Sequence, residues 1–165
     1  MMHRIPDLIS RSGVEFVVSV PCREFAWLLE NIELSEKLNL IFPQREDEGI
    51  ALMLGLEMSG RKTLGLFQDT LLGNSQNILS VIATSTDISM RFWLGSRNGE
   101  YLQQNLVHKY ITDRIEPSLS DKSFLISNFE HSKGKEQFED HELEKINKSL
   151  YPSPGIRNFL IWRIT

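Results

Sequence analysis

Short runs of β-favouring apolar residues alternate with stretches of helical periodicity along this 165-residue chain. The apolar runs fall at residues 16–20, 39–42, 63–68, 88–94, 124–127 and 159–164. This alternation is typical of a mostly parallel sheet with helices on both faces, because each parallel strand needs a crossover before the next. The sequence therefore predicts an α/β fold of three layers, with about six strands, in a single domain spanning residues 1–165.

Apolar residues at helical spacing predict the helices between these runs. The predicted helices cover residues 24–30, 46–58, 74–83, 106–115 and 138–150. The second of them opens with Glu46, Asp47 and Glu48, which suit a helix N-terminus, and Gly60 follows its end. We interpret residues 128–140, rich in Lys, Glu, Gly and Ser, as a solvated excursion between elements.

Composition excludes several classes of protein. A chain with 41% hydrophobic and 24% charged residues has enough apolar content for a real core, so disorder is disfavoured. The net charge of −4 and the lack of a dense Lys/Arg block disfavour a nucleic-acid partner. No apolar run approaches the length of a membrane span. We therefore expect a soluble cytoplasmic protein that binds neither nucleic acid nor a membrane.

Cysteine and histidine usage gives no metal-binding pattern. Cys22 is the only cysteine, which excludes an internal disulfide and a thiolate-clustered metal site within one chain. His3, His131 and His141 stand in polar surroundings without the spacing of metal ligands. We expect these three histidines to be surface residues.

Chemically distinctive residues follow the first three predicted strands. These segments are residues 19–23 (SVPCR), 43–49 (PQREDEG) and 68–75 (QDTLLGNS). Because ligands bind outside the carboxyl ends of strands in open α/β sheets, we expect the three segments to form one site. Gly73, Asn74 and Ser75 are predicted to offer free backbone amides to an anionic group at a helix start. The alternative is ordinary helix capping by Asn74.

Three motifs occur in order at these positions: VPC, REDEGIA and FQDTLLGNSQN. The ordered set resembles the pyrimidine-binding domain of thiamine-diphosphate-dependent 2-oxo acid decarboxylases, in particular those that act on sulfopyruvate or phosphonopyruvate. The resemblance covers residues 13–95 and returns weakly at the last strand, FLIWR. Each motif is weak alone, and their order makes the set fairly specific.

The resemblance implies a catalytic role for Glu48, which stands where the family's glutamate precedes a glycine. That glutamate bonds to N1′ of the cofactor's aminopyrimidine ring and promotes loss of the thiazolium C2 proton. The carboxyl must hold a proton near neutral pH. Burial at a subunit interface would favour the protonated form, whereas the helix N-terminus would oppose it, and we expect the effect of burial to be the larger. The alternative is that Glu48 belongs to a merely charged first helical turn. Pro21, Gly73 and Asn74 are the other implied cofactor contacts, and Gly49 would allow a partner or the ring to approach.

The implied substrate is a small anionic 2-oxo acid. Its predicted contacts are Cys22, Arg45, Gln68, Asp69, Ser75 and His108. Cys22 is expected beside the cleft but not as a nucleophile, since the cofactor performs that role. Arg45 is alternatively a solvated partner of the neighbouring acids, and His108 a structural or exposed histidine; the turn at residues 97–100 is a further candidate. Asp69 departs from the small polar pair of the family, which puts the substrate in doubt.

The chain lacks the Gly-Asp-Gly segment, followed after a spacer by Asn-Asn, that carries Mg²⁺ and the cofactor diphosphate in this family. The resemblance therefore implies a diphosphate-binding beta subunit, with thiamine diphosphate and Mg²⁺ between the subunits of a hetero-oligomer of at least two alpha and two beta chains. Alone, the chain should be inactive. Two alternatives stay open: a subunit of an acetolactate-synthase-like thiamine enzyme, and a catalytically silent α/β interaction module.

Overall fold

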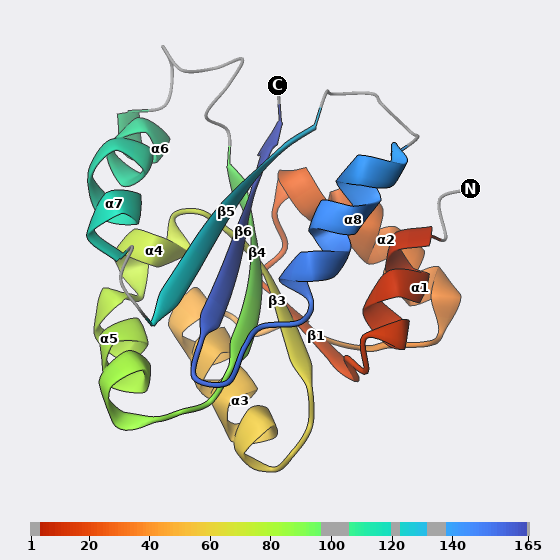
Figure 1. Ribbon diagram of the computed structural model, residues 1–165, viewed down its shortest axis with the longest axis horizontal. Helices are drawn as coiled ribbons and strands as arrows, with labels where there is room; N and C mark the ends of the chain where they lie inside the picture. Colours follow the sequence, from red (N-terminus) through yellow and green to blue (C-terminus); the bar gives the residue numbers. More distant parts are fainter. Residues whose placement is uncertain (1–3, 97–105, 120–122, 132–137, 165) are drawn as a thin grey trace.

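A computed structural model describes residues 4–96, 106–119, 123–131 and 138–164 of the chain (Figure 1). Six strands form one sheet in the order β2-β1-β3-β4-β6-β5, and every neighbouring pair is parallel. The strands are β1 (Phe16–Ser19), β2 (Asn39–Ile41), β3 (Thr63–Gln68), β4 (Met90–Ser96), β5 (Phe124–His131) and β6 (Arg157–Ile164). The predicted α/β class and the six strands are confirmed.

Helices cover both faces of the sheet, which gives three layers (Figure 1). One face carries α1 (Arg4–Arg11), the short turn η1 (Arg23–Phe25), α2 (Ala26–Ser35) and α8 (Asp140–Ser149). The other carries α3 (Glu46–Met58), α4 (Leu71–Asn74), α5 (Gln76–Ser85), α6 (Leu106–Tyr110), η2 (Ile111–Ile115) and α7 (Glu116–Leu119). Each face has its own buried apolar cluster against the sheet.

The strand order creates a topological switch point at the carboxyl ends of β1 and β3. The chain leaves β1 through α2 on one face to reach β2, and returns through α3 on the other face to reach β3. The loops after β1 and β3 therefore turn to opposite faces of the sheet. Such a switch point is where open α/β sheets bind ligands.

Two features of the fold differ from the sequence prediction. Helix α1 was not predicted; it buries Ile5 and Ile9, one turn apart, and Pro6 is tolerated in its first turn. Strand β5 continues to His131, four residues beyond its predicted end, so residues 128–131 are sheet and not a solvated excursion. The expectation of a surface His131 is wrong, because this side chain is 8% exposed and stacks on Phe138.

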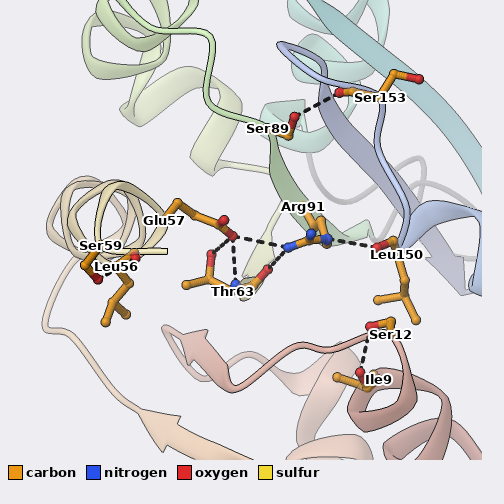
Figure 2. Close-up of polar contacts among 10 residues, drawn as sticks. All are labelled: Ile9, Ser12, Leu56, Glu57, Ser59, Thr63, Ser89, Arg91, Leu150 and Ser153. Atoms are coloured by element: carbon orange, nitrogen blue, oxygen red, sulfur yellow. Dashed lines mark hydrogen bonds and ion pairs between the residues drawn. The ribbon is translucent and has the colours of Figure 1, made fainter. Parts of the chain in front are cut away.

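A buried ion pair, Arg91–Glu57, links α3 to the amino-terminal end of the sheet (Figure 2). Arg91 on β4 donates from Nη1 to Glu57 Oε1 of α3 at 3.2 Å and to the Thr63 carbonyl at 3.1 Å. Its Nε donates to the Leu150 carbonyl at 2.8 Å, and the same Glu57 oxygen accepts from the Thr63 amide at 2.7 Å. Burial lowers the pKa of Arg91, and the charge of Glu57 opposes this shift. These contacts join α3, β3 and β4 to the segment after α8.

Candidate functional site

The loops that follow β1, β2 and β3 lie at one edge of the sheet, because these strands are adjacent and parallel. Pro21 follows β1, Glu48 lies in the first turn of α3 after β2, and Gly73 lies in α4 after β3. The structure thus brings the three predicted segments to the carboxyl edge, as expected. Pro21 and Glu48 are both exposed there.

The first turn of α3 is organised by its own acidic side chains. Glu48 Oε2 accepts a hydrogen bond from the Gln44 amide at 3.1 Å, and Asp47 Oδ1 accepts one from the Glu48 amide at 3.1 Å. Carboxylates at these positions satisfy backbone donors at the start of the helix and suit its dipole. Glu48 nevertheless keeps an exposed carboxyl group at the sheet edge, accessible to a ligand from outside the chain.

Arg45 pairs with an acid of the same turn. Its Nε lies 3.1 Å from Asp47 Oδ1, with the two side chains 70% and 43% exposed. An ion pair this exposed contributes little to stability. The structure therefore shows the solvated pairing that was the alternative for Arg45, and leaves its guanidinium at the surface of the site.

At Gly49, side chains of the same chain lie very close to the backbone of α3. A Cβ at this position would lie 2.9 Å from Phe67 Cζ and 3.0 Å from Pro43 Cγ. Real Cβ atoms avoid such distances, so the glycine lets α3 pack closely against β3. The approach that the sequence suggested for a partner or a cofactor ring is taken here by Phe67 and Pro43.

Cys22 is half-buried in the loop after β1. Burial, together with the smaller effect of the Glu24 charge, raises the pKa of its thiol to about 12. The nucleophilic form of cysteine is the thiolate, which is scarce at neutral pH with such a pKa. This supports the expectation that Cys22 is no nucleophile.

The segment after β3 is helical earlier than predicted. The amides of Gly73 and Asn74 both donate to the Thr70 carbonyl at 3.0 Å, and the Ser75 amide donates to the Leu71 carbonyl at 2.9 Å. The expectation of free amides for an anionic group is therefore wrong. The helix begins earlier than predicted because Leu71 and Leu72 are buried, so α4 starts before Gly73.

Capping by Asn74 is not observed either, because the N-cap residue of α5 is Ser75, without a side-chain cap. Ser75 is buried, with 2% exposure, and Asp69 has none. Gln68 is half-buried, and its Oε1 accepts a hydrogen bond from Thr70 Oγ1 at 3.4 Å. Of these three predicted substrate contacts, only Gln68 is not buried.

A second polar group at this edge was not predicted from sequence. Arg163 at the end of β6 donates from Nη2 to both carboxylate oxygens of Glu116 on α7, at 3.0 and 3.3 Å. It also contacts Asn128 Oδ1 of β5, at 3.1 Å from Nε and 2.9 Å from Nη2. Burial raises the pKa of Glu116; the charge of Arg163 lowers it and the charge of Asp69 raises it.

Of the four histidines, His131 and His141 have described side chains. His108 lies in α6, but its side chain is outside the described residues, as are His3 and the turn at residues 97–100. His141 is exposed, as predicted, with Nδ1 3.3 Å from Glu139 Oε2. Among the described residues, no group of three or more His, Cys, Asp or Glu side chains could hold a metal ion. In the same part of the chain, no helix is long and apolar enough to cross a membrane.

These features define a parallel α/β protein with a candidate ligand site at a topological switch point, flanked by an exposed glutamate at a helix N-terminus. Sequence comparison narrows this class. The chain is 31% identical over 94 residues to the sulfopyruvate decarboxylase alpha subunit of Methanothermobacter thermautotrophicus, which is 56% of this chain and 57% of that subunit. It is 41% identical over 68 residues to the alpha subunit of Methanococcus maripaludis, which is 41% of each chain.

A sulfopyruvate decarboxylase of Methanosarcina acetivorans is 28% identical over 99 residues, 60% of this chain and 25% of that protein. The chain spans about half the length of the alpha subunits it matches. No protein-family model matches it. The resemblance inferred from the motifs is confirmed as homology to sulfopyruvate decarboxylase alpha subunits over about half of the chain.

Proposed function

We propose that this chain is the pyrimidine-binding subunit of a thiamine-diphosphate-dependent 2-oxo acid decarboxylase of the sulfopyruvate or phosphonopyruvate type. The observation that carries the proposal is the placement of Glu48. It is an exposed carboxyl in the first turn of α3, at the carboxyl edge of the sheet beside the β1/β3 switch point. The homology to sulfopyruvate decarboxylase alpha subunits supports the same reading.

Glu48 is suited to hold a proton against a ring nitrogen of the cofactor. Its Oε2 accepts from the Gln44 amide, which orients the carboxyl without covering it. A partner chain packed over this edge would remove the carboxyl from water and thereby favour its protonated form. When bound, thiamine diphosphate supplies the electron sink for decarboxylation. The exposed Pro21 would form the wall on the β1 side, and Gly73 and Asn74 the wall on the β3 side.

The proposed substrate is a small 2-oxo acid with a second anionic group. Cys22, Arg45 and Gln68 are its proposed neighbours, because each is at least partly exposed at this edge. Asp69 and Ser75 are buried and would support this wall from behind. His108 remains a proposed neighbour from α6. The backbone amides of the Gly73 segment are not part of the proposal, since carbonyl groups already occupy them.

A beta-type partner would bind the cofactor diphosphate and Mg²⁺. The names of the relatives support a partner, since they designate alpha subunits. We further propose that partner and chain assemble as a hetero-oligomer with the cofactor between them. In this arrangement the isolated chain neither retains thiamine diphosphate tightly nor decarboxylates a 2-oxo acid.

Reconstitution tests this function. The chain is mixed with a candidate beta-type partner, thiamine diphosphate and Mg²⁺, and carbon dioxide release is measured with sulfopyruvate, phosphonopyruvate and pyruvate. Release from one of the two dianionic substrates, only when both chains are present, is the expected result. Condensation of two pyruvate molecules to acetolactate would favour the ligase alternative. A stable complex without turnover of any of the three would favour the silent interaction module.

A further inference from the structure

A row of buried polar residues crosses three strands at the carboxyl edge of the sheet. In the sheet register, Gln68 pairs with Gly95, Gly95 pairs with Trp162, and Ser96 pairs with Arg163. Asp69 directly follows β3, Ser96 ends β4 and Arg163 is the last residue but one of β6, so the three lie at the same level of the sheet; we call these three residues the polar row. Asp69 and Ser96 have no exposed surface.

The polar row lies on the face that α3 and α7 cover. Side chains two residues apart along a strand share a face, and Phe67, Leu94 and Ile161 belong to the apolar cluster of this face. Each member of the polar row follows one of these core residues by two positions. At this level of the sheet, polar side chains, two of them ionisable, therefore follow the apolar core.

Glu116 on α7 covers the row and pairs with Arg163. Its carboxylate is held by two hydrogen bonds from the Arg163 guanidinium, and the two side chains are only 9% and 11% exposed. Both bonds come from the one nitrogen Nη2, and charge-assisted hydrogen bonds are stronger than those between neutral groups. Asn128 adds a neutral acceptor to the same guanidinium from the neighbouring strand.

The segment of η2 and α7 also contacts the β3–α4 turn, residues 69–74. Ile115 Cδ1 lies 3.5 Å from the position of a Cβ on Gly73, so the segment packs against the turn there. Glu116, the next residue, is bonded to Arg163, which the sheet register places at the level of Asp69. In line with this placement, the charge of Asp69 raises the pKa of Glu116.

We propose that Arg163 and Glu116 are positioning residues for the β3–α4 turn. Arg163 supplies the cation that lets Glu116 and Asp69 lie close together in a buried space. Without that cation the two carboxylates repel each other, and α7 can relieve the repulsion only by moving away from the turn, which would also separate Ile115 from Gly73. A role of this turn in a cofactor site rests on the proposed function; its positioning by Arg163 does not.

The chain contains a matched control for this pair. Arg91 and Glu57 form an ion pair of 3.2 Å with side chains 8% and 11% exposed, which is close to the 3.0 Å and the exposure of Arg163 and Glu116. This pair lies at the opposite, amino-terminal end of the sheet (Figure 2). Removing either arginine removes a comparably buried cation, but only Arg163 lies at the carboxyl edge, at the level of the turn.

Hydrogen–deuterium exchange of the isolated full chain tests the proposal. The readout is the exchange of four amides of the turn, those of Asp69, Gly73, Asn74 and Ser75, which are all hydrogen-bonded in the structure. Arg163→Met should accelerate their exchange at least tenfold relative to Arg91→Met, compared at equal global stability by adjusting urea. The double variant Arg163→Met/Glu116→Gln should return exchange toward the wild-type rate, because one of the two like charges is gone.

Equal exchange in the two arginine variants, or a double variant as fast as Arg163→Met, would overturn the proposal. Glu116→Gln alone keeps a hydrogen-bond acceptor for Arg163, so it tests the idea even where Arg163→Met does not fold. It should leave the four amides as protected as in wild type, and tenfold faster exchange would contradict the charge argument. In the reconstituted complex, Arg163→Met should raise the half-saturating concentration of sulfopyruvate at least fivefold, with no such rise for Arg91→Met. A wild-type complex without activity refutes the proposed function and leaves the exchange result standing.

Discussion

Replacing Glu48 by Gln separates a catalytic role from a structural one. The Gln side chain keeps an oxygen that can accept from the Gln44 amide, the contact that Glu48 Oε2 makes at 3.1 Å. The helix loses one negative charge near its N-terminus, an interaction of about 0.3–1 kcal/mol, and Glu46 and Asp47 remain in the same turn. We therefore expect the free energy of unfolding to fall by less than about 1 kcal/mol.

The expected effect on catalysis is much larger. A Gln cannot donate and recover a proton at the ring nitrogen, and general acid–base groups contribute about two to four decades of rate. At about 1.4 kcal/mol per decade, this is about 3–5 kcal/mol of activation free energy, several times the expected loss of stability. The assay is steady-state decarboxylation by the reconstituted complex, with cofactor binding measured by calorimetry and stability by urea unfolding.

Glu46→Gln is the matched control, since it removes the same charge from the same turn without touching the proposed contact. It should keep at least half of the wild-type rate. A near wild-type rate for Glu48→Gln together with a severe defect for Glu46→Gln would show that the wrong carboxylate was chosen. Normal rates for both variants in an active complex would remove the proposed mechanism from α3.

Three further predictions concern the folded chain itself. Gly49→Ala should lower the free energy of unfolding, measured in urea, by about 1–3 kcal/mol, because the new Cβ overpacks against Phe67 and Pro43. Gly55→Ala on the same helix places its Cβ in open space and should raise this free energy by about 0.5–1 kcal/mol. The Cys22 thiol has a pKa of about 12, compared with an ordinary value of 9.0. At pH 8 it should therefore react with iodoacetamide about a thousandfold more slowly in the folded chain than in urea, and equal rates would contradict its burial. Arg91→Met should lower the free energy of unfolding by about 3–5 kcal/mol, because it leaves Glu57 buried without its cation. The control Lys148→Met breaks an exposed ion pair with Glu144 Oε1 and should produce no measurable change.

The sheet was predictable because its signal is local. Each strand is a short apolar run, and α3 was predicted to the residue because its acidic first turn and Gly60, with a φ of 81°, mark its two ends. Helix α1 escaped prediction because it is only eight residues long, although Ile5, Leu8 and Ile9 recur at helical spacing. A helix this short depends on tertiary packing, here against α2 and α8.

The errors at the site have a common physical origin. The Gly73 segment was assigned free amides because glycine and asparagine favour turns, but the two preceding leucines are fully buried and draw the chain into a helix before the glycine. His131 was assigned to the surface because its neighbours in sequence are polar. In β5, however, alternate residues face inward, so Phe129 and His131 are both buried while Glu130 between them is exposed. Tertiary burial decided both cases against the local composition.

Asp69 was predicted to contact the substrate, but the fold buries it completely. An aspartate in a loop after a strand is ordinarily solvated or bound to a ligand, and nothing in residues 68–75 indicates otherwise. Burying a carboxylate requires compensation, and the cation that we propose for this role, Arg163, stands 94 positions later in the numbering. Arg163 reaches the level of Asp69 only when β6 is inserted between β4 and β5. The carboxyl edge of the sheet is therefore completed by the last strand of the chain.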